Sequence, residues 1–126
     1  MPYEIKLHPT HEMLEIRFYG DISYDEALSA RQEASSLAES RKVKALLVDQ
    51  SKIAPFHGTT SDMFDFHTSH EEMFPPDLHM ALVYSPETTK PADARFAESV
   101  ALNHGLLFGA FTRRREALDW LIQERA

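Results

Sequence analysis

Three short, almost entirely apolar runs are the feature that most constrains the fold of this chain. They lie at residues 43–48 (VKALLV), 80–84 (MALVY) and 106–111 (LLFGAF). Short runs of this kind are typical of strands that are covered on both faces. Segments with helical spacing separate them, and strands joined through helices are normally parallel. The pattern therefore predicts an α/β fold built around a mixed β-sheet.

The chain begins with a different strand pattern. Apolar and polar residues alternate over residues 3–8 (YEIKLH) and 13–19 (MLEIRFY). A period of two is typical of half-buried strands, so we expect the polar side chains, including Glu15 and Arg17, to face water. The linker at 9–12 (PTHE) suits a turn, and the two strands are predicted to form a hairpin.

Two segments in the first two thirds of the chain carry helical signals. Ser23 and Glu26 have the spacing of a capping box, and small apolar residues recur at helical intervals from there to about Ser40. Ser61 can cap a second helix over residues 61–74. We expect both helices to pack on the sheet.

The last third of the chain predicts two more helices. Pro91 suits the first turn of one, which Gly105 ends, and Thr112 can cap the other. Asp49 is expected to end the strand at 43–48. The residues expected to face the core are Phe96, Ala97, Val100 and Ala101 in the third helix, and Ala117, Leu118, Trp120, Leu121 and Ile122 in the fourth. We thus predict one domain over residues 1–126, with about five strands and about four helices.

Composition narrows the class of protein. The chain has 126 residues, of which 43% are hydrophobic and 26% charged, as in soluble globular proteins. Its 13 Lys and Arg stand against 20 Asp and Glu, so the basic surface of a nucleic-acid-binding protein is not expected. The absence of cysteine excludes disulfides, thiolate zinc sites and cysteine nucleophiles. No apolar stretch suggests a signal peptide or a transmembrane segment, and we expect a cytoplasmic protein.

Several segments together resemble a known family. Beside the hairpin they are ALLVD (45–49), PADARFAESVALNHG (91–105) and FGAFTRRREALDWL (108–121). This combination resembles the SpoIIAA-like, or STAS-like, family of small stand-alone bacterial domains, and it covers nearly the whole chain. The strongest parts are Ala94-Arg95-Phe96, and Phe111-Thr112 followed by Glu116-Ala117-Leu118 and Trp120-Leu121. The resemblance implies a SpoIIAA/STAS-like fold.

The resemblance also implies a regulatory role. STAS anti-sigma-factor antagonists carry an Asp-Ser or Asp-Thr pair at the start of the second helix, where a partner kinase phosphorylates the serine. The matching stretch at 57–60 reads HGTT, with Gly58 at the phosphoserine position. Thr59 and Thr60 offer hydroxyl groups, but the preceding acid is missing, so the sequence argues against a phospho-switch there.

The family therefore implies a binding or regulatory module that acts through protein association, as a homodimer or with a regulatory protein partner. The related CRAL-TRIO fold suggests an alternative, a carrier or sensor of a lipid-like or other small anionic ligand. No GxSxG motif, dinucleotide motif or P-loop occurs in the sequence. We expect no catalysis of the protein's own and no cofactor.

Arginines mark the candidate ligand-binding site. Arg95 lies early in the third predicted helix, where strand ends and helix N-termini commonly form ligand crevices. Arg113, Arg114 and Arg115 stand at the start of the last helix, where each cation costs about 0.3–1 kcal/mol unless an anion compensates it. The triplet is either a solvated surface cluster or it meets an anion. The acidic segment 61–77 of a second copy is a candidate for that anion.

The predicted helix at 61–74 supplies apolar and metal-ligand candidates. Phe64 and Phe66 lie in a segment crowded with aromatic and methionine side chains, which forms an ordinary core, a self-association face or the rim of an apolar pocket. His67 and His70 are one helical turn apart and could share a divalent ion, but no HExxH signature accompanies them. A metal-dependent enzyme is the third alternative.

Overall fold

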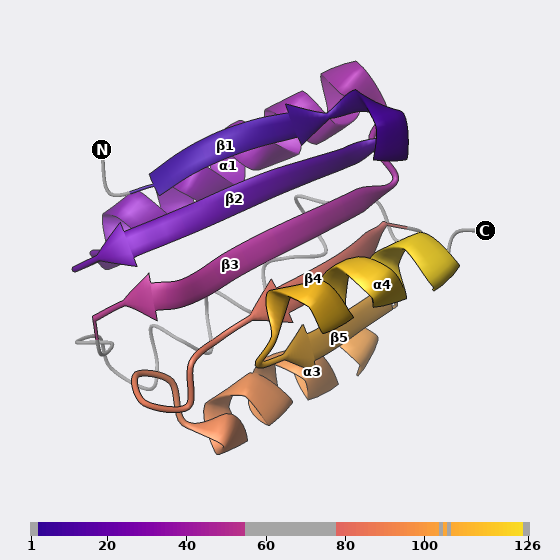
Figure 1. Cartoon of the computed structure of the whole chain (residues 1–126). Helices are drawn as coiled ribbons and strands as arrows, with labels where there is room; N and C mark the ends of the chain where they lie inside the picture. The colour runs from indigo at the N-terminus through magenta and orange to yellow at the C-terminus, as the bar shows by residue number, and fades with distance from the viewer. Residues whose placement is uncertain (1–2, 55–77, 104, 106, 125–126) are drawn as a thin grey trace.

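The fold is a mixed β-sheet with helices on both faces, seen in a computed structural model that describes residues 3–54, 78–103, 105 and 107–124 (Figure 1). Five strands form one sheet in the order β1-β2-β3-β4-β5. The elements are β1 (Tyr3–His8), β2 (Met13–Gly20), α1 (Tyr24–Arg41), β3 (Ala45–Ile53), β4 (His79–Val83), α3 (Pro91–Asn103), β5 (Leu107–Phe111) and α4 (Arg114–Glu124). The predicted α/β class with about five strands is confirmed, whereas the helix expected at 61–74 lies outside the described residues.

An antiparallel hairpin opens the sheet, and the other strands are parallel. β1 pairs with β2 so that Leu7 faces Leu14, and a short 3-10 helix at Pro9–His11 joins the two strands. β2, β3, β4 and β5 pair in parallel. Helices α1, α3 and α4 follow β2, β4 and β5, so all three helices begin at the edge of the sheet where the parallel strands end. This edge positions the candidate site.

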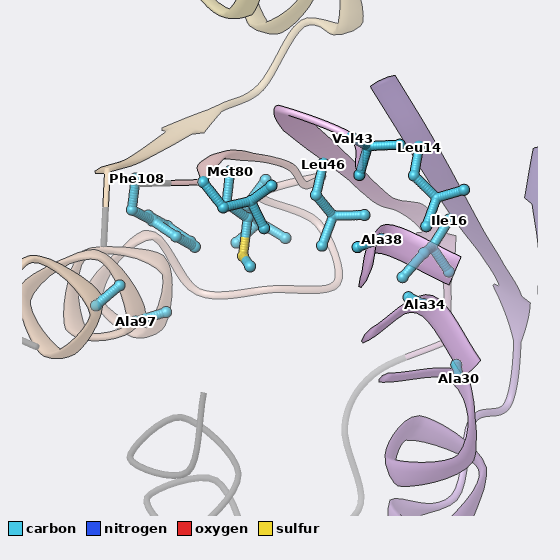
Figure 2. Packing of buried hydrophobic residues seen from close by; sticks show 13 residues of the cluster. Leu14, Ile16, Ala30, Ala34, Ala38, Val43, Leu46, Met80, Ala97 and Phe108 are labelled. Carbon is cyan, nitrogen blue, oxygen red and sulfur yellow. The ribbon is translucent and has the colours of Figure 1, made fainter. Parts of the chain in front are cut away.

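Side chains that alternate along the strands build two separate cores. On one face, Leu14, Ile16 and Leu46 pack against α1 and α3 (Figure 2). The buried residues of α1 on that face include three alanines at helical spacing, Ala30, Ala34 and Ala38, whose small side chains let the helix approach the sheet. On the other face, the buried cluster consists of Met13, Ala45, Leu47, Ala81, Val83, Ala117 and Leu121, the last two from α4.

The prediction that Asp49 ends its strand is wrong. β3 continues to Ile53, because β2 runs on to Gly20 and pairs with Lys52 and Ile53. Between these pairs β2 advances two residues, from Arg17 to Tyr19, while β3 advances three. The extra residue is a β-bulge, which lets the strand continue past a polar side chain.

The helix termini and inner faces depart from expectation in three places. α4 begins at Arg114, and the Arg113 carbonyl accepts a hydrogen bond from the Ala117 amide, so Arg113 takes the cap position predicted for Thr112. Phe96 is 37% exposed because Ala94, Ala97 and Ala101 form the buried stripe of α3. Ile122, predicted in the core, is 39% exposed. The capping box of Ser23 and Glu26 forms as predicted.

Candidate functional site

A buried carboxylate held by two arginines and a histidine is the main polar cluster among the described residues. Glu15 of β2 is 1% exposed, on the face of the sheet that carries α4. His8, Arg17 and Arg114 surround it, and Asp49 lies next to Arg114. We call these five residues the Glu15 cluster. The prediction that Glu15 faces water is wrong, because the side chains around it cover the carboxylate.

Each of the two carboxylate oxygens of Glu15 accepts two hydrogen bonds. Arg114 binds them with both terminal nitrogens, Nη1 to Oε2 and Nη2 to Oε1, the latter at 2.9 Å. Arg17 Nε lies 2.6 Å from Oε2, and His8 Nε2 lies 2.8 Å from Oε1. A two-fold guanidinium contact of this kind is the strongest geometry available to an arginine and a carboxylate. The hydrogen-bonding capacity of Glu15 is therefore fully used.

The elements bring these residues together from four parts of the chain. Arg17 lies two positions after Glu15 and so shares its face of β2. His8 is the last residue of β1, Asp49 faces Arg17 across the β2–β3 pair, and Arg114 is the first residue of α4. The closing contact, between residues 15 and 114, joins positions 99 apart in the sequence.

Asp49 links the cluster to the bulge in β3. Its Oδ2 lies 3.5 Å from Arg114 Nη1. Its Oδ1 accepts hydrogen bonds from the Ser51 amide at 3.0 Å and the Ser51 hydroxyl at 2.7 Å. An aspartate that binds the backbone two residues later stabilises a local turn of the chain. One side chain thus supports both the bulge and the start of α4.

The surroundings of Glu15 keep it ionised. Burial alone would raise the pKa of this carboxyl, but hydrogen bonds from Arg114, Arg17 and His8 outweigh burial and lower the pKa from 4.5 to about 2. The same hydrogen bonds stabilise the charged form of the two arginines, so they raise the pKa of Arg17 and of Arg114. A carboxylate with so low a pKa holds no proton near neutral pH and cannot serve as a general acid there. The arrangement instead holds the start of α4 against β2 and β3.

This geometry determines the tautomer of His8. An ionised carboxylate only accepts hydrogen bonds, so His8 Nε2 must carry the proton in its contact with Glu15. We expect nitrogen-15 NMR of the imidazole at high pH to show the Nε2–H form of His8 in the wild type. In Glu15→Leu, which removes the acceptor, the spectrum should change toward a mixture of tautomers. A dominant Nδ1–H form in the wild type would contradict the contact.

The structure separates the arginines named from the sequence. Arg114 is bound to Glu15, whereas its neighbours Arg113 and Arg115 are exposed. Arg95 is exposed on α3 and forms no ion pair with another described residue. The other candidates, Thr59, Thr60, Phe64, Phe66, His67 and His70, lie outside the described residues. Within the described ranges, no group of three or more His, Cys, Asp or Glu side chains could hold a metal ion.

Sequence reasoning missed Glu15, His8 and Arg17 as parts of this site. Alternation along β2 assigns Glu15 and Arg17 to one face, but it does not show what covers that face. The usable signal was the arginine triplet, because a cation at a helix N-terminus is stabilised by a nearby anion.

These features define the class of fold. An N-terminal hairpin followed by parallel strands, with helices on both faces of one sheet, is the SpoIIAA-like, or STAS-like, arrangement. The chain is similar to an anti-sigma factor antagonist from Mycobacterium paratuberculosis, with a TM-score of 0.62 and 13% identity. It is also similar to an uncharacterized protein of the DUF3478 family with a SpoIIAA-like fold from Shewanella loihica, with a TM-score of 0.57 and 16% identity.

Each of these likenesses covers 94% of this chain and 93% of the other protein. At these identities they show the fold, and the fold expected from the sequence is confirmed. The sequence matches no protein-family model and no curated protein. No helix in the described part of the chain combines the length and the hydropathy needed to cross a membrane.

Proposed function

We propose that the protein is a regulatory module that acts by associating with another protein and performs no catalysis of its own. The observation that carries this proposal is the fold shared with an anti-sigma factor antagonist over 94% of the chain. The Glu15 cluster supports it, because its central carboxylate is saturated with hydrogen bonds and ionised. No observation on the described residues favours the carrier of an anionic ligand or the metal-dependent enzyme.

The first turn of α4 is the proposed contact surface. Arg114 fixes the backbone there through its bonds to Glu15, while Arg113 and Arg115 extend into solvent on either side. The chain as a whole has a formal net charge of -7, so two exposed cations on a fixed helix start form a local exception. Such charges at the rim of an interface give specificity and speed association with an acidic partner.

A paired comparison of charge variants tests this surface. The double variant Arg113→Glu with Arg115→Glu is expected to weaken binding to the partner about 10-fold or more, through repulsion of its acidic surface. The control is Arg41→Glu with Lys44→Glu, which makes the same change in formal charge at exposed residues near the end of α1 and the start of β3. Binding is measured by affinity capture from a lysate of the source organism, followed by calorimetric titration with the purified partner.

The two variants separate the possible outcomes. Loss of binding in the first variant with retention in the control supports the proposed surface. Equal binding by both variants would place the contact elsewhere on the molecule. A wild-type chain that captures no protein but converts a small molecule would overturn the regulatory role itself.

A further inference from the structure

The two edges of the sheet differ in how they are protected. β1, at one edge, presents the exposed charged side chains of Glu4 and Lys6. β5, at the other, reads LFGAF and contains no charged residue. Natural proteins usually protect sheet edges with charges, prolines or short strands, because an unprotected edge pairs with any extended chain. Of the described strands at the edges, β5 lacks such a charge.

The outward backbone groups of β5 can be identified from one hydrogen bond. The Tyr84 amide donates to the Phe111 carbonyl at 3.0 Å, so the backbone of Phe111 faces β4. Backbone direction alternates along a strand, which also turns Leu107 and Gly109 toward β4. The N–H and C=O groups of Phe108 and Ala110 therefore point away from the sheet.

We propose that the β5 edge binds the β5 edge of a second copy of this chain, in antiparallel register about a two-fold axis at Gly109. This register places Phe108 opposite the partner's Ala110, and Ala110 opposite the partner's Phe108. The outward groups of these residues then form hydrogen-bonded pairs. Gly109 meets its own counterpart in a pair without hydrogen bonds, where the Cα atoms come closest, at about 4.5 Å. Within one chain, a Cβ atom at Gly109 would lie 2.9 Å from the ring of Phe111, so packing inside the chain already restricts this position to glycine.

The side chains in this register are complementary in size. Phe108 packs in the core of its own chain and faces the small Ala110, and Leu107, which is 42% exposed, is covered by the partner's Phe111. A strand of unrelated sequence would not match these positions.

Self-association is tested on the purified chain alone, which keeps it independent of the proposed regulatory function. We expect the wild type to be a dimer at tens of micromolar by sedimentation equilibrium. Leu107→Lys should raise the dimer dissociation constant about 10-fold or more, because it places a charge on the paired edge. Circular dichroism and Trp120 fluorescence check that the variant is folded.

Ile122→Lys is the matched control. Ile122 is an exposed aliphatic residue like Leu107, 39% against 42% exposed. It lies two helical turns after Arg114, and the Arg114 side chain faces β2 and β3. The side of α4 nearer to β5 is marked by Trp120, which contacts Phe111. Ile122 therefore points away from the β5 edge. Its substitution should leave the dimer dissociation constant within about 2-fold of the wild type.

Amide hydrogen exchange tests the same edge without any substitution. In the dimer, the Phe108 and Ala110 amides should exchange at least about 3-fold more slowly than in Leu107→Lys at the same concentration, because they exchange from the monomer, whose fraction rises about as the square root of the dissociation constant. The Phe111 amide faces β4 and should be protected in both proteins. A monomeric wild type, a dimer that Leu107→Lys leaves intact, or a dimer with rapidly exchanging Phe108 and Ala110 amides would each overturn the proposal. Protection of these amides only after addition of a different protein would do so as well.

Discussion

Replacing Arg114 by alanine is expected to lower the free energy of unfolding by about 2–4 kcal/mol. The substitution leaves the Glu15 carboxylate buried, with only Arg17 and His8 as hydrogen-bond donors. Loss of one partner from a buried ion pair is strongly destabilising, but the Arg114 side chain is 33% exposed, so water replaces part of the lost interaction. Urea unfolding at neutral pH, followed by the fluorescence of Trp120, measures the effect.

The neighbouring arginines provide the controls. Arg113→Ala and Arg115→Ala change exposed side chains and should alter stability by at most about 0.5 kcal/mol. Arg114→Lys should lie between these variants and Arg114→Ala, because lysine keeps the charge but cannot form two parallel bonds to a carboxylate. If Arg114→Ala were as stable as Arg113→Ala, the contact with Glu15 would contribute nothing to stability.

A double-mutant cycle separates the pair from the rest of the site. In a Glu15→Leu background the carboxylate that needs Arg114 is absent, so Arg114→Ala should cost much less than in the wild type. The difference between the two costs measures the coupling of Glu15 and Arg114. We expect this coupling to exceed about 1 kcal/mol, as for groups in one hydrogen-bonded network.

The contact with Glu15 explains why an arginine is tolerated at the start of α4. A cation at a helix N-terminus opposes the helix dipole, at a cost of about 0.3–1 kcal/mol. For Arg114 the two-fold contact with a buried carboxylate, with Asp49 as a second acid nearby, offsets that cost. The three arginines are therefore unequal: Arg114 contacts Glu15, whereas Arg113 and Arg115 are exposed and belong to the proposed contact surface.

The local patterns of the sequence were sufficient to predict most of the fold. Alternation at 3–8 and 13–19 predicted the hairpin, and the apolar runs predicted the parallel strands. Errors arose where a neighbouring element decides the outcome. β3 passes Asp49 because β2 continues beside it, which no pattern within β3 reveals.

The candidate site was less predictable for the same reason. The sequence left the arginine triplet as either a solvated cluster or the partner of an anion, and residue 15 lies 99 positions from residue 114. Alternation shows that Glu15 points to one face of its strand, and only the packing of α4 shows that this face is covered there. The burial of this carboxylate therefore depends on tertiary packing, although the pattern of the strand predicts a half-exposed position.

The free energy of unfolding should depend on pH because of Glu15. The pKa of this carboxyl is about 2 in the folded protein against an ordinary value of 4.5, so the folded state favours the ionised form. The resulting stabilisation is fully present above pH 4.5 and is lost as the pH falls toward 2. A difference of this size corresponds to about 3 kcal/mol.

Glu15→Gln isolates this contribution, because glutamine has a similar shape and no titrating group. Other carboxyl groups titrate in both proteins, so their effects cancel in the difference between the two free energies of unfolding. We expect that difference to be greatest at neutral pH and to approach zero near pH 2, in urea titrations at several pH values. If the two proteins lost stability in parallel, Glu15 would titrate alike in the folded and unfolded chains. The cations around it would then not favour its ionised form, and the Glu15 cluster could not be what holds α4 to the sheet.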